Sequence, residues 1–303
     1  MRREKPSWGE PKAGGAAGKS PSAAPLAPGL YVVATPIGNA SDVSLRALAT
    51  LNGVDAIIAE DTRVTAKLLA IHGISRPLLT YNDHNGERER PRLMARLQAG
   101  AALALVSDAG TPLISDPGYK LVRDARANGI AVFAVPGPAA LIAALSVAGL
   151  PTDRFFFGGF LPAKAGERKK ALHAAKSIPA TLVFYESPQR LSRSLADMAE
   201  TLGDRDAAVA RELTKLHEDL KRGALSELAQ MFSNVESVKG EIVVVIGPPK
   251  QSEAFPLRNI DALLKLSLPH MPVKAAAELV ALASNAPKRE IYARALQLRR
   301  TND

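Results

Sequence analysis

The sequence predicts an α/β protein with two lobes and a small C-terminal helical appendix. Short apolar runs alternate with segments of helical spacing, which is typical of βαβ units around a mainly parallel sheet. This pattern changes near residue 150, and beyond residue 250 apolar residues recur at helical spacing only. We therefore expect lobes over residues 29–150 and 151–250 and an appendix over 255–303. Residues 1–28, rich in Pro, Gly, Ala and Ser, are expected to be a disordered leader.

The first lobe alternates strands and helices throughout. Apolar runs predict strands at residues 30–34, 54–59, 78–81, 102–106 and 130–135. Helices are expected after each strand, over residues 41–51, 64–71, 87–99, 119–128 and 139–148. Ser41 or Asp42 can cap the first helix, and Gly73 follows the end of the second.

The second lobe and the appendix have different patterns. Strands are expected at 155–157, 181–185, 207–211 and 242–246, and helices at 167–177, 188–202 and 225–232. Residues 213–222 fit either a strand or a turn. In the appendix, helical spacing over 273–284 and 287–298 predicts a pair with a helix-turn-helix outline, although most short helix pairs are only packing units.

Composition excludes several classes of protein. The chain has no cysteine, so disulfides, thiolate metal sites and cysteine nucleophiles are excluded. No apolar stretch reaches the roughly 18 residues of a spanning helix, and no apolar segment follows the basic N-terminus, so we expect no membrane association and a cytoplasmic location. Neither a P-loop nor a GxGxxG fingerprint is present, and no His or Asp pair has metal-ligand spacing, so we expect no metal.

The charge of the chain favours a polyanionic partner. The net charge is +9, which is typical of proteins that bind nucleic acid. One expected helix carries most of a local cluster, namely Lys164, Arg168, Lys169, Lys170 and Lys176. This cluster fits a solvated helix face and an RNA contact equally well.

Three loops rich in Gly and Pro follow three predicted strands of the first lobe. They span residues 35–39, 107–118 and 136–138, and the second reads SDAGTPLISDPG. In a parallel sheet such loops meet at one edge, where α/β proteins bind ligands. Glycine lets the backbone approach a ligand closely and proline stiffens the loop, which suits a nucleoside-like molecule held largely by main-chain groups.

Several polar residues stand at the same strand ends. Glu60 and Asp61 follow a buried strand, where they can bind, catalyse or cap the next helix. Asp108 is a better ligand contact than Asp116, which can cap the helix that starts at Tyr119. For His84, a solvated or hydrogen-bonded side chain is the simpler interpretation.

These motifs together resemble the ribosomal RNA small subunit methyltransferase I family of the tetrapyrrole methylase superfamily. The matching segments are residues 108–118 (DAGTPLISDPG), 34–39 (ATPIGN), 59–63 (AEDTR), 135–138 (VPGP), 159–162 (GFLP), 184–188 (FYESP), 211–215 (RELTK) and 240–241 (GE). The resemblance covers about residues 30–298. Two positions depart from the family pattern: Ala139 stands where relatives often have a small polar residue, and Asp83 where they often have Glu.

The resemblance implies a fold, a cofactor and a reaction. The fold would be two α/β lobes with S-adenosylmethionine in a cleft between them, usually in a homodimer. The reaction would be methylation of a cytidine ribose 2′-hydroxyl in the decoding region of 16S ribosomal RNA. Carried over by motif, the cofactor contacts would be Pro36, Gly38, Asp108, Thr111, Ala139, Ala140, Tyr185, Ala210 and Gly240.

The reaction also suggests catalytic and RNA-binding residues. A ribose hydroxyl is a poor acid, so a base would help, and the candidates are Glu60, Asp61 and Glu186. Phosphates would be held by Arg63, Lys164, Arg168, Lys169 and Lys170. His84 or Tyr185 could stack on an extruded base. Two alternatives stay open at this point: a methyltransferase for tetrapyrroles or other small molecules, and a non-catalytic RNA-binding assembly protein.

Overall fold

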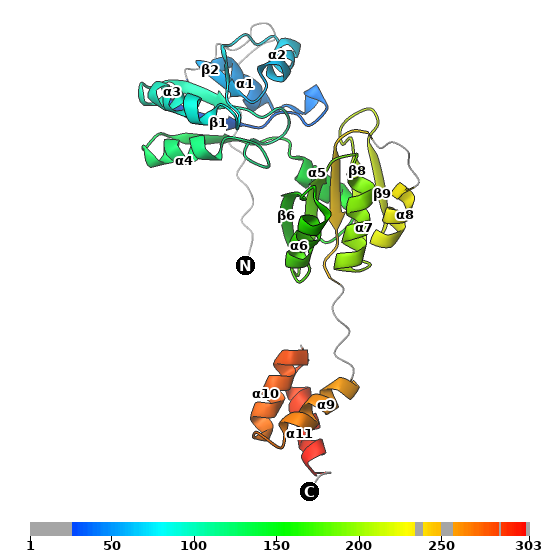
Figure 1. Cartoon of the computed structure of the whole chain (residues 1–303). Coiled ribbons are helices and arrows are strands. Elements are labelled where there is room, and N and C mark those ends of the chain that lie inside the picture. The colour runs from blue at the N-terminus through cyan, green and yellow to red at the C-terminus, as the bar shows by residue number, and fades with distance from the viewer. Residues whose placement is uncertain (1–25, 234–238, 250–256, 285, 301–303) are drawn as a thin grey trace, which may run out of the picture. The chain divides into compact units, whose positions relative to one another are not determined.

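The computed structural model describes residues 26–233, 239–249, 257–284 and 286–300 (Figure 1). The expected leader lies outside these residues except for positions 26–28. Among the described residues, no helix is both long and apolar enough to cross a membrane. The chain divides into two compact units, Met1–Ala139 and Ala140–Asp303.

A five-stranded parallel sheet forms the centre of the first unit. Its spatial order is β3-β2-β4-β1-β5, and the strands are β1 (Gly29–Val33), β2 (Ala56–Ala59), β3 (Leu78–Thr80), β4 (Ala102–Leu105) and β5 (Val132–Val135). Helices α1 (Leu45–Gly53) and α2 (Thr62–Ile71) pack on one face of the sheet, and α3 (Gly86–Gln98) and α4 (Tyr119–Ala127) pack on the other. All five carboxyl ends therefore lie along one edge, as the sequence predicts.

The first helix starts later than the sequence suggests. Residues Ala40–Asp42 form a short 3-10 turn, and α1 begins after Ser44, whose Oγ accepts a hydrogen bond from the backbone N–H of Ala47 at 3.0 Å. Ser44, and not Ser41 or Asp42, is therefore the N-cap of α1. At the next helix, Asp61 caps α2 by accepting a hydrogen bond from the N–H of Arg63.

The boundary between the lobes lies before the helix that the sequence assigns to the first lobe. Helix α5 (Ala140–Ala148) packs against β7, β8 and β10 of the second sheet. Because its small, apolar surface is buried there, α5 belongs to the second unit, and the boundary falls after Ala139 rather than after residue 150.

The second unit has a mixed sheet in the order β6-β7-β10-β8-β9. The strands are β6 (Phe155–Phe160), β7 (Thr181–Glu186), β10 (Ile242–Ile246), β8 (Asp206–Arg211) and β9 (Asp219–Ala224). Only β6 and β7 pair in parallel. Helices α6 (Ala165–Ala175), α7 (Leu191–Leu202) and α8 (Leu225–Ser233) cover the face where Leu182, Phe184 and Val244 are buried. Residues 213–222, for which the sequence allows a strand or a turn, contain turns followed by the first part of β9.

The described residues of the C-terminal module form three helices where the sequence predicts two. Helices α10 (Val273–Ser284) and α11 (Lys288–Arg300) match the expected pair, and α9 (Leu257–Ser267) precedes them. Ile260 and Leu264 of α9 pack with Val280 and Ile291 in the core of the module. The helix-turn-helix pair is thus completed by a third helix that buries its apolar face.

Candidate functional site

The loops after β1, β4 and β5 are joined to one another at the carboxyl edge of the first sheet. Thr35 and Gly110 form an antiparallel bridge, with N···O distances of 2.8 and 3.1 Å in the two directions. The hydroxyl of Thr111 donates to the carbonyl oxygen of Pro138 at 2.9 Å. The loop after β4 is therefore tied to both neighbouring loops. We call residues 34–39, 106–118 and 136–139 together the rim.

Glycines allow the rim loops to approach this closely. Gly110 has φ +82°, and a Cβ there would lie 3.3 Å from Cγ2 of Ile37. A Cβ on Gly137 would lie 3.0 Å from the Cβ of Ala34. The three rim loops thus pack closely against one another. On the rim, Pro36 and Thr111 are partly exposed, and Gly38 and Asp108 are exposed.

Carboxylates gather along the same sheet edge. Oδ1 of Asp108 accepts a hydrogen bond from the backbone N–H of Asp61 at 3.0 Å, which joins the β4 and β2 loops. Burial raises the pKa of Glu60, and the nearby charges of Asp108, Asp116 and Asp83 raise it further. Burial also raises the pKa of Asp116 to about 6, with a smaller contribution from Asp108. The edge therefore has a negative potential that favours a cationic ligand.

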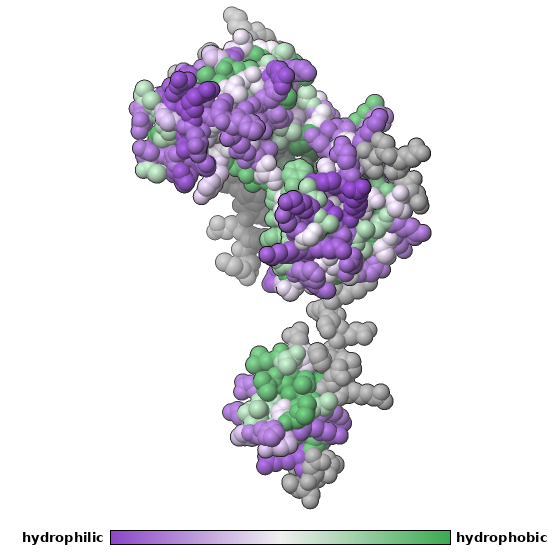
Figure 2. Space-filling view, in the orientation of Figure 1, coloured by the Kyte–Doolittle hydropathy of each residue, from purple (hydrophilic) through white to green (hydrophobic). Residues whose placement is uncertain are grey.

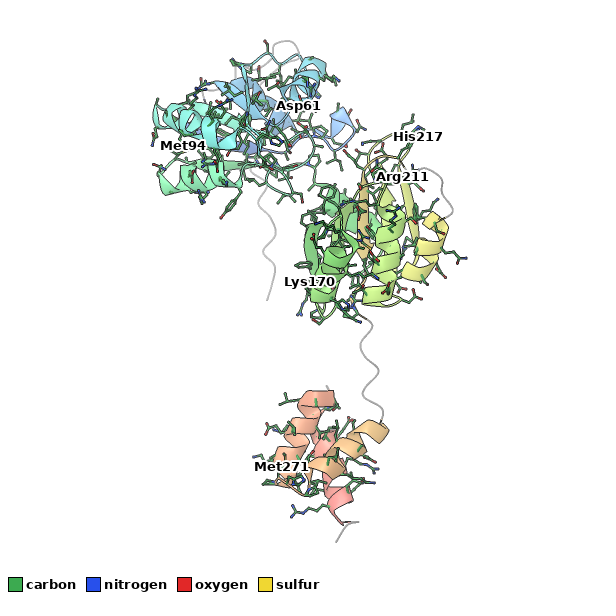
Figure 3. All side chains as sticks on the ribbon, in the orientation of Figure 1. Asp61, Met94, Lys170, Arg211, His217 and Met271 are labelled. Atoms are coloured by element: carbon green, nitrogen blue, oxygen red, sulfur yellow. The ribbon has the colours of Figure 1, made fainter. Side chains whose placement is uncertain are left out.

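Asp61 and Glu60 are adjacent but have opposite properties. Hydrogen bonds from the side chain and backbone of Arg63 lower the pKa of Asp61 to about 2. Asp61 lies at the start of α2 (Figure 3), where it caps the helix and pairs with Arg63. A carboxylate with so low a pKa is a poor proton acceptor, so Glu60 is the better base of the two. The Arg63 side chain is 86% exposed and remains accessible to a phosphate.

Two predicted cofactor contacts lie in one row of the second sheet. Tyr185 on β7 and Ala210 on β8 both pair with Val243 of β10, one on each side. Residues directly opposite one another in antiparallel strands share a face, so all three lie on one face of the sheet. Their alternation with Phe184 and Val244 places them on the face opposite α6–α8, where α5 packs. The ring of Tyr185 is further packed edge-on against Phe157 and Phe160.

Gly240, a third predicted contact, is fixed by an ion-pair cluster at the same end of this sheet. Gly240 has φ +94°, and a Cβ there would lie 2.4 Å from side-chain atoms of Glu212. Oε1 of Glu212 accepts hydrogen bonds from the N–H of Glu241 at 2.9 Å and from Nζ of Lys215 at 2.8 Å. Glu212 and Lys215 were not among the predicted site residues, although both lie in the RELTK segment that the family resemblance includes.

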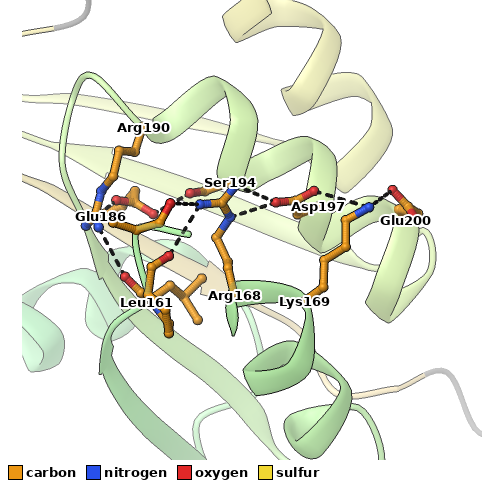
Figure 4. Close-up of polar contacts among 10 residues, drawn as sticks. Leu161, Arg168, Lys169, Glu186, Arg190, Ser194, Asp197 and Glu200 are labelled. Atoms are coloured by element: carbon orange, nitrogen blue, oxygen red, sulfur yellow. Dashed lines mark hydrogen bonds and ion pairs between the residues drawn. The ribbon is translucent and has the colours of Figure 1, made fainter. Parts of the chain in front are cut away.

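Glu186 has a structural environment rather than a catalytic one. Its side chain is fully buried, and it accepts hydrogen bonds from the Ser194 hydroxyl at 2.5 Å and the Ser187 N–H at 2.7 Å. Arg190 forms an ion pair with it at 2.8 Å (Figure 4). Because Glu186 is sealed from solvent and its carboxylate is already hydrogen-bonded, its surroundings do not favour the catalytic base predicted for it, and Glu60 is the better candidate.

The predicted RNA-binding cluster on α6 divides into two groups. Arg168 is buried and pairs with Asp197 of α7 at 2.6 Å, and Lys169 pairs with Glu200 at 2.7 Å (Figure 4). Arg168 therefore joins two helices and is buried between them, so its surroundings do not favour the phosphate contact predicted for it. Lys164 and Lys170 are exposed, so a phosphate contact stays a prediction for them. Lys170 is labelled in Figure 3. His84 is exposed in the loop after β3.

Two regions of the chain match known protein families. Residues 29–229 match the family described as Tetrapyrrole (Corrin/Porphyrin) Methylases, and residues 256–299 match the RsmI C-terminal HTH domain. A protein of Mesorhizobium japonicum named ribosomal RNA small subunit methyltransferase I is 48% identical, with 92% of this chain and 95% of that protein covered. The chain belongs to the ribosomal RNA small subunit methyltransferase I family.

Other members and the fold agree with this placement. The Pseudomonas aeruginosa protein of the same name is also 48% identical and covers 88% of this chain and 96% of its own length. One similar solved structure is a uroporphyrin-III C-methyltransferase from Thermus thermophilus complexed with S-adenyl homocysteine. Its TM-score is 0.51 at 21% sequence identity, and the match covers 72% of this chain and 96% of that chain. At this identity the likeness shows the fold alone. As a member of the ribosomal RNA small subunit methyltransferase I family, the chain is a methyltransferase.

Proposed function

We propose that this methyltransferase transfers the methyl group of S-adenosylmethionine to a cytidine ribose 2′-hydroxyl in the decoding region of 16S ribosomal RNA. The 48% identity to relatives named as ribosomal RNA small subunit methyltransferases, over nearly their whole length, carries the proposal. The basic excess of the chain, with a net charge of +9, suits a polyanionic substrate. A tetrapyrrole methyltransferase has no use for that excess or for a helix-turn-helix module.

The rim suits S-adenosylmethionine in shape and in charge. A Cβ on Gly110, Gly118 or Gly137 would lie 3.3, 2.9 or 3.0 Å from its nearest neighbour, so these positions favour glycine, and backbone groups can line an adenosine closely. Its carboxylates favour a sulfonium cation, and Asp108 is the one held in place by a neighbouring loop. The contacts proposed for the cofactor are Pro36, Gly38, Asp108, Thr111 and Ala139 of the first unit and Ala140, Tyr185, Ala210 and Gly240 of the second. How the two units share the cofactor stays a prediction.

Positioning is the main task that the reaction leaves to the protein. S-adenosylmethionine supplies an electrophilic methyl group on sulfur, and a thioether leaves without needing a proton. The chain must therefore align the attacking hydroxyl oxygen and accept its proton. Glu60 is the proposed acceptor, because Asp61 has a lowered pKa and Glu186 is buried in an ion pair.

Substrate RNA, assembly state and location complete the proposal. Arg63, Lys164 and Lys170 would bind phosphates, and His84 or Tyr185 would stack on an extruded base. The family resemblance supports a homodimer and a cytoplasmic location, where ribosomal subunits are assembled.

Methyl transfer to defined substrates tests this proposal. The purified protein is incubated with methyl-labelled S-adenosylmethionine and small ribosomal subunits from cells that lack the activity, and in parallel with free 16S rRNA or a tetrapyrrole. We expect label in rRNA, either within the subunit or free. Label in the tetrapyrrole alone would replace the proposal with the small-molecule reaction, and RNA binding without any transfer would replace it with a non-catalytic role.

A further inference from the structure

Helix α11 presents a basic and aromatic stripe on a face beside its packed side. Ile291 and Ala295 are buried in the core of the C-terminal module. The outward positions recur at intervals of three and four residues, which places them on one face of a helix. They are Arg289, Tyr292, Leu296 and Arg299, all exposed. We call these four residues the α11 stripe.

The arginines of the stripe differ from Lys288 and Arg294 of the same helix. Lys288 pairs with Glu278 of α10 at 2.7 Å, and Arg294 pairs with Asp261 of α9 at 2.6 Å. Both pairs join α11 to the rest of the module. Within the part of the chain that the structure describes, no carboxylate lies within ion-pair distance of Arg289 or Arg299. Among the described residues, these two guanidinium groups therefore form no ion pair that stabilises the module.

The ring of Tyr292 lies between the two arginines along the helix. It is 40% exposed, and Leu296, one turn further on, is 38% exposed. The arginines are ten residues apart in sequence, which places their backbones roughly 15 Å apart on a helix. Two separated phosphate-binding groups with an aromatic surface between them are the recognition elements of unpaired nucleic acid, in which bases stack on aromatic rings and guanidinium groups bind phosphates.

The negative charge at the proposed cofactor site suggests why phosphate-binding groups would lie elsewhere, as in the α11 stripe. The sheet edge that we propose for the cofactor carries Glu60, Asp61, Asp83, Asp108 and Asp116, and carboxylates repel an RNA backbone. Arg168 is buried in its ion pair with Asp197, so it does not compensate for this repulsion. Cations on other surfaces can compensate for it, and the α11 stripe adds two to those proposed at Arg63, Lys164 and Lys170.

We propose that the α11 stripe binds an unpaired segment of the substrate RNA, with Arg289 and Arg299 on phosphates and Tyr292 stacked on a base. The identity of the RNA rests on the proposed function, whereas the recognition mode rests on the stripe alone. The stripe is distinct from the apolar outer face of α10, where Leu279 is 50% exposed and Leu282 is 80% exposed. Figure 2 shows apolar surface on this module.

The test compares two pairs of charge-removing substitutions in the full-length protein. Arg289→Gln with Arg299→Gln removes both cations of the stripe. The matched control, Lys265→Gln with Lys274→Gln, removes two exposed cations from α9 and α10 of the same module. Affinity for 16S rRNA is measured across a range of salt concentrations, and the kcat and KM of methyl transfer to small subunits are measured in parallel.

We expect the stripe pair to lower affinity at least tenfold and to reduce the salt slope by about 1.4 to 1.8, while the control pair leaves both unchanged. The KM for subunits should rise with little change in kcat. Tyr292→Ala should lower affinity without changing the slope, and Tyr292→Phe should retain affinity.

The outcomes separate this inference from the proposed function. Equal effects of the two pairs, or no effect of the stripe pair, would overturn the inference even if the wild-type protein methylates subunits. A wild-type protein that transfers no methyl group, but whose RNA affinity depends on the stripe, would overturn the proposed function and leave the inference standing.

Discussion

Oδ1 of Asp108 accepts a hydrogen bond from the backbone N–H of Asp61 at 3.0 Å, across two neighbouring strands of the first sheet. The bond joins the rim to the segment that carries Glu60, the proposed base. One hydrogen bond thus joins a proposed cofactor contact to the segment of the proposed base. A change at Asp108 should therefore affect both binding and catalysis.

Replacing Asp108 tests this shared contact. Asp108→Ala should abolish binding of S-adenosylmethionine, because it removes both a carboxylate of the rim and the contact with Asp61. Loss of one exposed hydrogen bond costs about 1 to 2 kcal/mol, so the protein should stay folded. Asp108→Asn keeps an acceptor for the Asp61 N–H and separates the two effects. Calorimetry that shows unchanged affinity in the Ala variant would remove Asp108 from the cofactor site.

Gly110 allows a matched comparison with another glycine of the first lobe. Gly110 and Gly129 have φ values of +82° and +69°, so alanine at either should cost about 1 to 2 kcal/mol of stability. Only at Gly110 would the new Cβ meet a neighbour, Cγ2 of Ile37, whereas nothing lies within 4 Å at Gly129. Gly110→Ala should therefore weaken cofactor binding, and Gly129→Ala should not. Similar affinities in the two variants would contradict a close fit of the rim to the cofactor.

The pH dependence of the reaction should report Glu60. A general base acts in its deprotonated form, and burial and nearby carboxylates raise the pKa of Glu60 above its usual value. The methyl-transfer rate should therefore rise with pH through a range above that of an ordinary glutamate. Glu60→Gln should lower kcat and remove this rise. An unaltered pH profile in the Gln variant would show that another group accepts the proton.

Asp116 should make the stability of the first lobe depend on pH. Burial raises its pKa from 3.8 to about 6, so folding favours the protonated form. Its contribution to stability is full below its unfolded pKa and is lost as the pH rises through about 6. The free energy of unfolding of Asp116→Asn, relative to that of the wild type, should therefore be about 1 to 2 kcal/mol higher at neutral pH than at acidic pH. This figure allows for the partial exposure of Asp116. Chemical denaturation at both pH values measures this difference, and a difference that stays constant would contradict the assignment.

Arg168 and Lys170 should respond differently to the same substitution. Arg168→Gln leaves Asp197 without its buried partner and should cost about 3 to 5 kcal/mol. Lys170→Gln should leave stability unchanged and, if Lys170 contacts a phosphate, reduce the salt slope of RNA binding by about 0.7 to 0.9. Thermal unfolding and RNA titrations check these results. Equal stability of the two variants would contradict the structural role of Arg168.

The parallel sheet and its rim could be predicted because they depend on local patterns. Apolar runs that end in Gly and Pro mark both the strands and their carboxyl ends. In a parallel sheet these ends share one edge whatever the order of the strands, so the edge could be predicted without that order. Helix α9 could also be predicted, because Leu257, Ile260 and Leu264 recur at helical spacing, but the helices expected in the appendix from the sequence begin only at residue 273.

The roles of charged residues depended on partners that are distant in the chain. Arg168 looks like its basic neighbours on α6 until Asp197 is found on α7. Glu186 looks like a candidate base until Ser194 and Arg190 surround it. Helix α5 is apolar enough to pack on either sheet, so its spacing did not decide to which lobe it belongs.

The position of the transferred methyl group tests the central claim most directly. After reaction with methyl-labelled S-adenosylmethionine, rRNA from small subunits is digested to nucleosides and the labelled species is identified by mass spectrometry. The account predicts 2′-O-methylcytidine from wild-type protein and little or none from Glu60→Gln or Gly110→Ala. Label on a base, or on the ribose of another nucleoside, would contradict it.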